Sequence, residues 1–204
     1  CEHCLAICPT GAISILGVDP EDCIKLKDGF PSSKSLETLI KGRRSIRKYN
    51  PEALDPETIR YLVDTAWHAP TGANVQSVLF TVTMTAEKTD AFRKELYQRL
   101  HEMFSKLDPE KDDFSLSYLR RFNEAFEKHG IDTILHGAPH FVIVSAPQNI
   151  PLPVEDSIIA LTTFELLAVT KNVGTVWNGM LTVCVKRFFP DMAEKLGIPK
   201  DHTI

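Results

Sequence analysis

The pattern of apolar and polar positions predicts a series of amphipathic helices. Asp55 and Pro56 suit the cap and the first position of one helix, and the apolar residues that come next at helical spacing are Ile59, Leu62, Val63, Ala66 and Trp67. This spacing predicts that Trp67 belongs to the core rather than stacking on a ligand ring. An earlier helix is expected to be capped by Ser35 and to end at Gly42, and its apolar face is formed by Leu36, Leu39 and Ile40.

The rest of the chain predicts further helices together with buried strands. Between residues 85 and 129, two helices divided by Asp108-Pro109 have apolar stripes formed by Phe92, Leu96, Leu100, Met103 and Leu107, and by Leu119, Phe122 and Phe126. Apolar and β-branched runs predict strands over 78–84 and 141–144, so that His136 and His140 are expected in a turn before the second strand rather than in a metal site. Residues 155–172 form a helix that is apolar nearly all round, which must be buried in the core or at a subunit interface.

The composition is that of a globular protein with one main domain. The chain has 204 residues, of which 43% are hydrophobic and 25% charged, and its net charge of -4 gives no electrostatic case for nucleic acid or an anionic membrane as partner. No apolar run reaches the roughly 18 residues of a membrane span, and no signal segment begins the chain. We therefore expect a soluble, cytoplasmic protein. Because the chain begins at Cys and stops before an expected strand, we interpret the sequence as a fragment cut at both ends.

Three of the five cysteines are clustered at the N-terminus, as Cys1, Cys4 and Cys8. Their CxxCxxxCP spacing resembles the last three cysteines of bacterial ferredoxins, and the CPTGAI segment resembles the end of the ferredoxin motif and the residues directly after it. The resemblance implies thiolate ligands of a 4Fe-4S cluster whose ligand set is incomplete in this fragment. A zinc knuckle or a set of free thiols is the alternative. Cys184, among apolar neighbours, is interpreted as a buried small hydrophobic residue.

A basic stretch, residues 41–49 with the sequence KGRRSIRKY, comes directly after the first helix and is called the arginine-rich stretch below. Three guanidinium groups beside one hydroxyl provide the donors that hold a phosphate, although a solvated basic turn is the simpler alternative. A second stretch, residues 69–76 with the sequence APTGANVQ, is predicted to be a loop and is called the amide loop. It presents amide side chains just before a strand.

Together, RRSIRKY and APTGANVQ resemble the start of the nitroreductase family of FMN enzymes. The resemblance implies an α+β fold in which helices flank a central, mostly antiparallel sheet, and it implies a homodimer. It divides the chain into the end of a ferredoxin-like segment at 1–27, a linker at 28–34, and a nitroreductase-like FMN domain at 35–204 that is truncated at its C-terminus.

The resemblance also implies which residues bind FMN. The phosphate and ribityl end is assigned to Arg43, Arg44 and Ser45, with Arg43 favoured over Arg44 for the main phosphate contact, and Arg47 is placed toward the pyrimidine edge. The amide loop contributes Pro70, Thr71, Asn74 and Gln76, which we expect close to the arginines. A second flavin-side segment, residues 174–180, contributes Asn178 and Gly179, although the same residues would also suit a plain turn into a helix.

The expected function is the reduction of a small electrophile, such as a nitro compound or a quinone, in a ping-pong cycle. Electrons are expected from NAD(P)H or from an iron-sulfur donor such as a ferredoxin, and no side chain is assigned as a catalytic acid or base. Two alternatives remain open. One is a different reaction on the same scaffold, such as dehalogenation or dehydrogenation, and the other is a non-enzymatic electron carrier.

Overall fold

The structure, a computed structural model, describes residues 3–14, 17, 19, 21, 23 and 29–204. Its contacts divide the chain into two compact units, Cys1–Arg43 and Arg44–Ile204. The second unit therefore begins inside the arginine-rich stretch, later than the start at residue 35 expected from the sequence. The predicted limits 1–27, 28–34 and 35–204 stay predictions.

The helices described in the first unit are α1 (His3–Ile7) and α2 (Ser33–Gly42). Ser32 caps α2, since its side-chain oxygen accepts a hydrogen bond of 3.1 Å from the backbone N–H of Ser35. The predicted cap at Ser35 was therefore wrong, because Ser32 has the extended backbone that lets its hydroxyl reach the first turn. The predicted end of the helix at Gly42 is confirmed.

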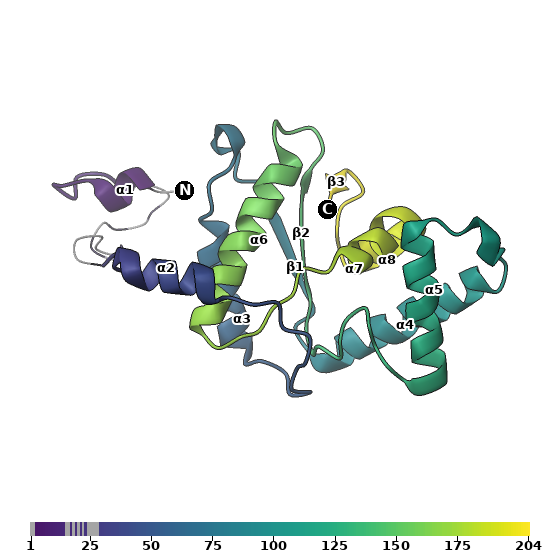
Figure 1. The fold of residues 1–204 in the computed structure, drawn as a ribbon. Coiled ribbons are helices and arrows are strands. Elements are labelled where there is room, and N and C mark those ends of the chain that lie inside the picture. The colour runs from purple at the N-terminus through teal and green to yellow at the C-terminus, as the bar shows by residue number, and fades with distance from the viewer. Residues whose placement is uncertain (1–2, 15–16, 18, 20, 22, 24–28) are drawn as a thin grey trace. The chain divides into compact units, whose positions relative to one another are not determined.

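The second unit contains a three-stranded sheet with the order β1 (Leu79–Val82), β2 (Val142–Pro147) and β3 (His202–Thr203). Both pairs are antiparallel: Phe80 lies opposite Val144, and Ala146 opposite Thr203. Helices flank this sheet (Figure 1). The predicted α+β fold with an antiparallel sheet is confirmed.

Two long helices pack together on the sheet, α3 (Pro56–Trp67) and α6 (Pro153–Thr170). Asp55 caps α3 by accepting from the N–H of Thr58 at 3.2 Å, with Pro56 at the first position, as predicted. The cluster buried between them consists of Leu62, Ala66, Phe164 and Ala168, and it reaches Phe80 and Val142 of the sheet. Burial of these apolar side chains is what holds α3 and α6 together.

Trp67 does not belong to this core. It is the last residue of α3, its side chain is 44% exposed, and its ring meets His68 edge-on. The prediction of a core tryptophan was wrong because Ala66 already fills the buried face, and the next residue points about 100° away around the helix.

The remaining helices form the largest core. They are α4 (Ala86–Phe104), α5 (Phe114–His129), α7 (Gly179–Val183), the π-helical turn η4 (Cys184–Phe188) and α8 (Pro190–Lys195). The short, exposed η3 (Pro109–Lys111) lies between α4 and α5 in the chain. The two helices predicted between 85 and 129 are thus confirmed. Tyr97 and Phe126 stack across α4 and α5 with ring centroids 3.8 Å apart, and Cys184 is fully buried in this core, as predicted.

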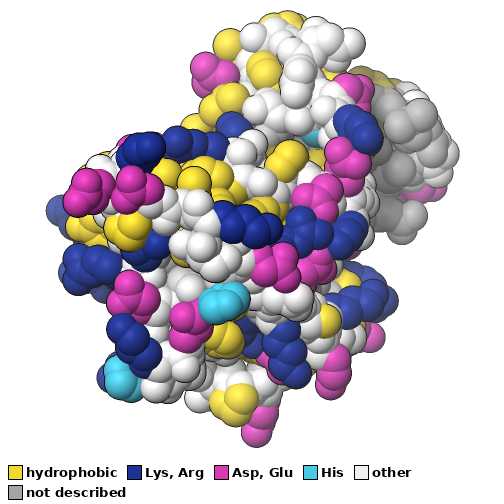
Figure 2. All heavy atoms as spheres, turned by 90° about the vertical axis from the view of Figure 1, so that its right-hand side faces the viewer, with side chains coloured by type: hydrophobic (Ala, Val, Ile, Leu, Met, Phe, Trp, Pro, Cys, Tyr) yellow, Lys and Arg dark blue, Asp and Glu magenta, His cyan; other side chains and the backbone are white. Residues whose placement is uncertain are grey.

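The surface beside α4, α5 and α8 has charges of both signs. Figure 2 shows basic and acidic side chains interspersed there, which agrees with the small net charge of the chain. Within the described ranges, no helix is both long enough and apolar enough to cross a membrane.

Candidate functional site

The arginine-rich stretch enters the second unit as an extended segment that is tied to the loop after α6. The N–H of Ile46 donates to the carbonyl oxygen of Thr175 at 2.9 Å. A Cβ at Gly174 would lie 2.9 Å from the Ile46 side chain, so only glycine allows this approach. Arg44, Ser45 and Arg47 flank the anchored Ile46 and are exposed. The segment therefore carries two exposed guanidinium groups and one exposed hydroxyl.

His140 fixes the far end of the same segment. Its Nε2 accepts from the N–H of Leu54 at 2.8 Å, so the ring proton of the neutral imidazole is on Nδ1, which donates to the carbonyl oxygen of Thr83 at 2.6 Å. The imidazole thus links residues 44–54 to the end of β1. His136 and His140 both lie in the turn before β2, as predicted.

The turn before β2 is organised around the carboxylate of Asp132, whose side chain is 8% exposed. Arg93 and Tyr97 donate to it at 2.7 and 3.0 Å, and so do the backbone N–H groups of residues 134, 135 and 137. Burial alone would raise the pKa of Asp132, but these donors outweigh burial and lower it. The turn is therefore held around a charged carboxylate at neutral pH.

The same turn faces both predicted flavin segments. Burial lowers the pKa of His136; the charge of Asp132 opposes this effect, and the charge of Arg47 adds to it, so both charges act on His136. The carbonyl oxygen of Ile134 accepts from Asn178 Nδ2 at 2.6 Å. Asn178 also caps α7 through Oδ1, so its side chain is already committed within the chain. The backbone carbonyl oxygen of Asn178 also accepts from the N–H and the hydroxyl of Thr182, both at 3.2 Å.

The amide loop lies at the other end of α6. It contains the short helix η2 (Gly72–Asn74), and the N–H of Gly72 donates at 2.8 Å to Oδ1 of Asp156 in the first turn of α6. Asn74 is exposed and Gln76 is half-buried, with its N–H bonded to the Thr71 hydroxyl at 3.0 Å. Pro70 is exposed as well. Figure 1 shows this loop beside the start of α6.

Within one chain, α6 separates the two predicted halves of the site. The amide loop is bound to Asp156, whereas Ile46 is bound to residue 175, beyond the end of α6 at Thr170. A rise of about 1.5 Å per residue places Asp156 and Thr170 about 21 Å apart along the axis. Within one chain, the amide loop therefore does not lie beside the arginine-rich stretch, where the sequence analysis expected it, because the two stretches are bound at opposite ends of α6.

A large cavity of about 900 Å³ runs along β2, α6 and the loop after α6. Of the predicted FMN residues, Asn178 and Gly179 line it, and Ile46 and Lys48 of the arginine-rich stretch line it as well. The lining is mostly apolar. The arginines themselves lie outside this lining, as do the residues of the amide loop.

Two acidic residues of α6 were missed by the sequence analysis. Asp156 and Glu165 are 1% and 6% exposed on a helix that is otherwise strongly apolar. Oε2 of Glu165 accepts from Trp177 Nε1 at 3.0 Å, which links α6 to the segment 174–179. The sequence alone could have indicated both residues, because a carboxylate in a strongly apolar helix is buried only where it has hydrogen-bond partners.

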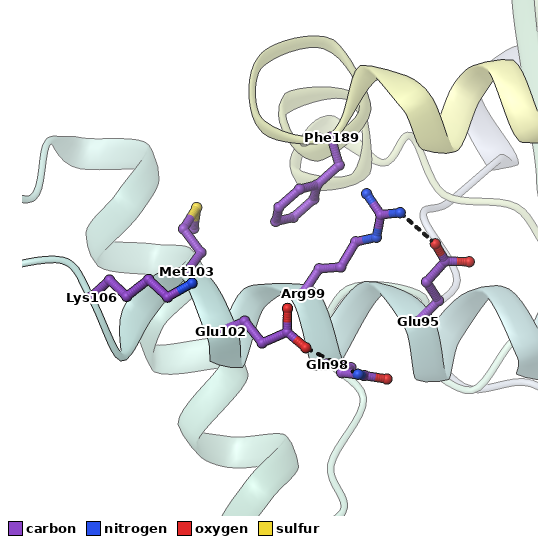
Figure 3. A pocket seen from close by; sticks show the side chains of 7 residues that line it. All are labelled: Glu95, Gln98, Arg99, Glu102, Met103, Lys106 and Phe189. Atoms are coloured by element: carbon purple, nitrogen blue, oxygen red, sulfur yellow. Dashed lines mark hydrogen bonds and ion pairs between the residues drawn. The ribbon is translucent and has the colours of Figure 1, made fainter.

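A second cavity of about 550 Å³ lies on α4 below the ring of Phe189 (Figure 3). Its central cation, Arg99, is paired with both Glu95 and Asp191 at 2.7 Å and lies near the Phe189 ring. The charge of Arg99 is therefore already balanced. None of the predicted site residues lines this cavity, so we do not assign it to FMN.

The N-terminal cysteines are described only in part, because Cys1 lies outside the described residues. Cys4 and Cys8 are free thiols, and the side chain of Thr10 together with backbone donors lowers the pKa of Cys8 to about 7. Among the side chains that the structure describes, no group of three His, Cys, Asp or Glu residues is arranged to hold a metal ion. The predicted 4Fe-4S ligand set stays a prediction.

Comparison with known proteins identifies the family. Residues 40–204 match the nitroreductase family, and because this match covers most of the chain, the protein belongs to that family. Nitroreductase NfnB of Mycolicibacterium smegmatis is 25% identical over 136 residues, which are 57% of this chain and 58% of NfnB. The chain thus spans somewhat more than half the length of this relative.

Solved structures share the fold. A nitroreductase with bound FMN from Bacteroides fragilis superimposes with a TM-score of 0.66 at 22% identity, over 85% of this chain and 84% of the other. NfnB from Mycobacterium smegmatis in complex with NADPH superimposes with a TM-score of 0.56 at 21% identity, over 84% of both chains. Iodotyrosine deiodinase bound to FMN and 3-iodo-L-tyrosine superimposes with a TM-score of 0.56 at 18% identity, over 82% of this chain and 84% of the other. At these identities the similarity shows the fold.

Proposed function

We propose that this protein is an FMN-dependent oxidoreductase that reduces a small electrophile such as a nitro compound or a quinone. The proposal is carried by one observation: the backbone between the exposed Arg44 and Arg47 is anchored through Ile46 directly against the glycine-containing loop 174–179. Family membership and the FMN-bound relatives support it. Bound FMN would supply the two-electron chemistry.

The residues of the second unit fit an FMN phosphate and ring. Arg44, Ser45 and Arg47 offer charge-assisted donors to the phosphate and to the electron-rich edge of the ring, where a cation stabilises negative charge. Nothing lies within 4 Å of where a Cβ would stand at Gly179, so the backbone there is open to close approach, whereas the space at Gly174 is occupied by the side chain of Ile46. Because the Asn178 side chain is committed to Ile134 and to the α7 cap, we assign its contact to backbone atoms. Arg43, which ends the first unit, keeps its sequence-based assignment to the phosphate.

The complete site would require a homodimer. Arg47 and the amide loop lie at opposite ends of α6, and the exposed apolar side chains of α6 include Val154, Ile158 and Ile159, which are 40–48% exposed. A two-fold axis across this face would bring the amide loop of one copy to the arginine-rich stretch of the other. Pro70, Thr71, Asn74 and Gln76 would then contact FMN that is held by the partner.

Two electron donors suit this arrangement. NfnB was solved with NADPH, which supports a nicotinamide donor for this chain as well. The CxxCxxxCP run supports a 4Fe-4S cluster that receives electrons from a ferredoxin-like protein, with Cys1, Cys4 and Cys8 as three of its ligands. Iron and sulfide analysis of anaerobically purified protein tests the cluster, and protein without iron would leave the nicotinamide as donor.

We also propose a cytoplasmic location.

Reductive dehalogenation is the second candidate, because one structural relative is a deiodinase bound to FMN. Assays with a nitroaromatic, a quinone and an iodinated phenol, each with NADPH or dithionite as reductant, separate these reactions. Bound FMN without turnover of any acceptor would indicate an electron carrier instead.

Complementation between two variants tests the shared FMN site. Arg47→Ala and Asn74→Ala should each weaken FMN binding by about ten- to a hundredfold, because charge-assisted contacts contribute roughly 1.5–3 kcal/mol and amide contacts somewhat less. After the two variants are mixed and allowed to exchange subunits, half of the dimers are mixed, and each mixed dimer contains one intact site. About a quarter of all sites should then bind FMN normally.

The exposed Arg60→Ala on α3 is the matched control for loss of a cation and should bind FMN like the wild type. Failure of the mixture to recover any tight binding would show that the two residues do not act across a dimer. If Arg47→Ala bound FMN as tightly as Arg60→Ala, the phosphate assignment itself would be wrong.

A further inference from the structure

The amide loop has an unusual backbone conformation. Ala73, Asn74 and Gln76 have φ angles of 51°, 55° and 53°, in the left-handed region. Asparagine tolerates this region, but alanine and glutamine rarely adopt it, because their Cβ crowds the following carbonyl. A strained segment of this kind persists only where its surroundings determine it.

Besides the backbone hydrogen bonds of η2, the described residues make three contacts that hold the shape of this loop. The Gly72 N–H is bound to Asp156 Oδ1 at 2.8 Å, and the Gln76 N–H is bound to the Thr71 hydroxyl at 3.0 Å. The third contact is steric, since a Cβ at Gly72 would lie 3.1 Å from the side chain of Leu152. Only the first contact joins the loop to a buried residue of another element, so Asp156 is its anchor on α6.

Burial of the Asp156 carboxylate opposes folding, so stability does not explain its presence. Its side chain is 1% exposed, and its Oδ2 is buried with no hydrogen-bond partner among the residues that the structure describes. A buried oxygen that is left unsatisfied opposes folding, and an apolar residue would suit this apolar helix better. An acidic side chain near the start of a helix is stabilised by the helix dipole, but this does not explain why Asp156 is buried. The neighbouring Glu155 gains the same stabilisation while it is exposed.

We propose that Asp156 is a positioning residue that acts through Gly72 and holds the strained amide loop in the geometry in which Asn74 and Gln76 contact FMN. This inference rests on the proposed FMN site. The carboxylate fixes where the loop begins, and the three left-handed residues then set the directions of the two amide side chains. A loop released from this anchor would relax toward ordinary φ angles and would turn its amides away.

Two nearly isosteric variants test the anchor in the full chain. Asp156→Asn keeps an oxygen acceptor for the Gly72 N–H, whereas Asp156→Leu removes it and keeps the number and branching of the heavy atoms. Glu155→Gln is the matched control. FMN affinity is measured by fluorescence quenching, the environment of the bound flavin by visible circular dichroism, and folding by thermal unfolding.

We expect Asp156→Leu to bind FMN about tenfold more weakly with an altered flavin dichroism, as for loss of one charge-assisted contact. Asp156→Asn should stay within about threefold of the wild type, since a neutral amide oxygen still accepts the Gly72 hydrogen bond. Glu155→Gln should match the wild type. If Asp156→Asn retains FMN affinity that Asp156→Leu loses, the role of Asp156 is to accept the Gly72 hydrogen bond and does not depend on its charge.

The inference is overturned if Asp156→Leu folds and binds FMN like the wild type, or if Asp156→Asn is as defective as Asp156→Leu. Should Asp156→Leu fail to fold, Gly72→Ala supplies the test, because its Cβ displaces the loop while Asp156 is kept. Its FMN affinity should fall and should recover in Gly72→Ala/Leu152→Ala, and unchanged affinity in Gly72→Ala overturns the inference. A wild-type chain that binds no FMN would instead overturn the proposed function.

Discussion

The Asp132 carboxylate should contribute more to stability than any exposed ion pair described in the second unit. In Asp132→Asn, one carboxylate oxygen is replaced by an NH₂ group that faces two donors, Nε of Arg93 and the N–H of Gly137, now 2.7 and 3.0 Å away. Two hydrogen bonds are lost, and the mostly buried guanidinium of Arg93 loses its buried carboxylate, although it keeps the exposed Asp90 and the carbonyl oxygen of Ala138 as partners. Breaking a buried charged pair costs about 3–5 kcal/mol, so we expect a loss of about 3 kcal/mol in the free energy of unfolding.

The stabilising effect of Asp132 should also depend on pH. Its pKa is lowered in the folded protein, so the unfolded chain binds the proton more readily than the folded one. The stability that this group contributes is therefore fully present above about pH 4, the ordinary pKa of aspartate, and is lost as the pH falls through the lowered value. Asp132→Asn should remove this part of the acid sensitivity.

Urea unfolding at pH 7 and at several lower pH values measures both effects. Glu124→Gln, which removes the exposed pair with Lys128, is the control and should cost no more than about 0.5 kcal/mol. A loss below about 1 kcal/mol for Asp132→Asn at pH 7 would refute the reasoning. So would wild-type and variant curves that decline in parallel below pH 4.

Two further predictions concern close packing and thiol reactivity. Gly174→Ala places a Cβ 2.9 Å from the branched side chain of Ile46 and should destabilise the fold by about 1–3 kcal/mol, whereas Gly179→Ala, with nothing within 4 Å, should change the thermal midpoint little. Equal midpoints for the two variants would contradict the tight contact. In protein freed of iron, iodoacetamide at pH 7 should alkylate Cys8, whose pKa is lowered to about 7 by a threonine hydroxyl, long before Cys184, whose pKa is raised to about 12 by burial. Peptide mass spectrometry that found the buried thiol modified first would contradict this order.

Local signals in the sequence predicted most of the helices. Asp55-Pro56 fixed the start of α3, and Asp108-Pro109 divided α4 from α5, because capping and proline geometry act within one turn. The same kind of reasoning failed for Trp67, since helical spacing alone does not say which residue at the end of a helix meets a neighbour. It also failed for Ser35, where Ser32 stands three residues earlier and reaches the same turn.

By itself, the sequence determined the secondary structure of the main domain, its α+β class and the two stretches by which it resembles the nitroreductases. Only the tertiary structure decided that those stretches lie at opposite ends of α6 and that Asp156 anchors Gly72. These two residues are 84 positions apart. Propensities and caps act over a few neighbouring residues, whereas contacts between distant residues depend on how packed elements are placed, which no local pattern specifies.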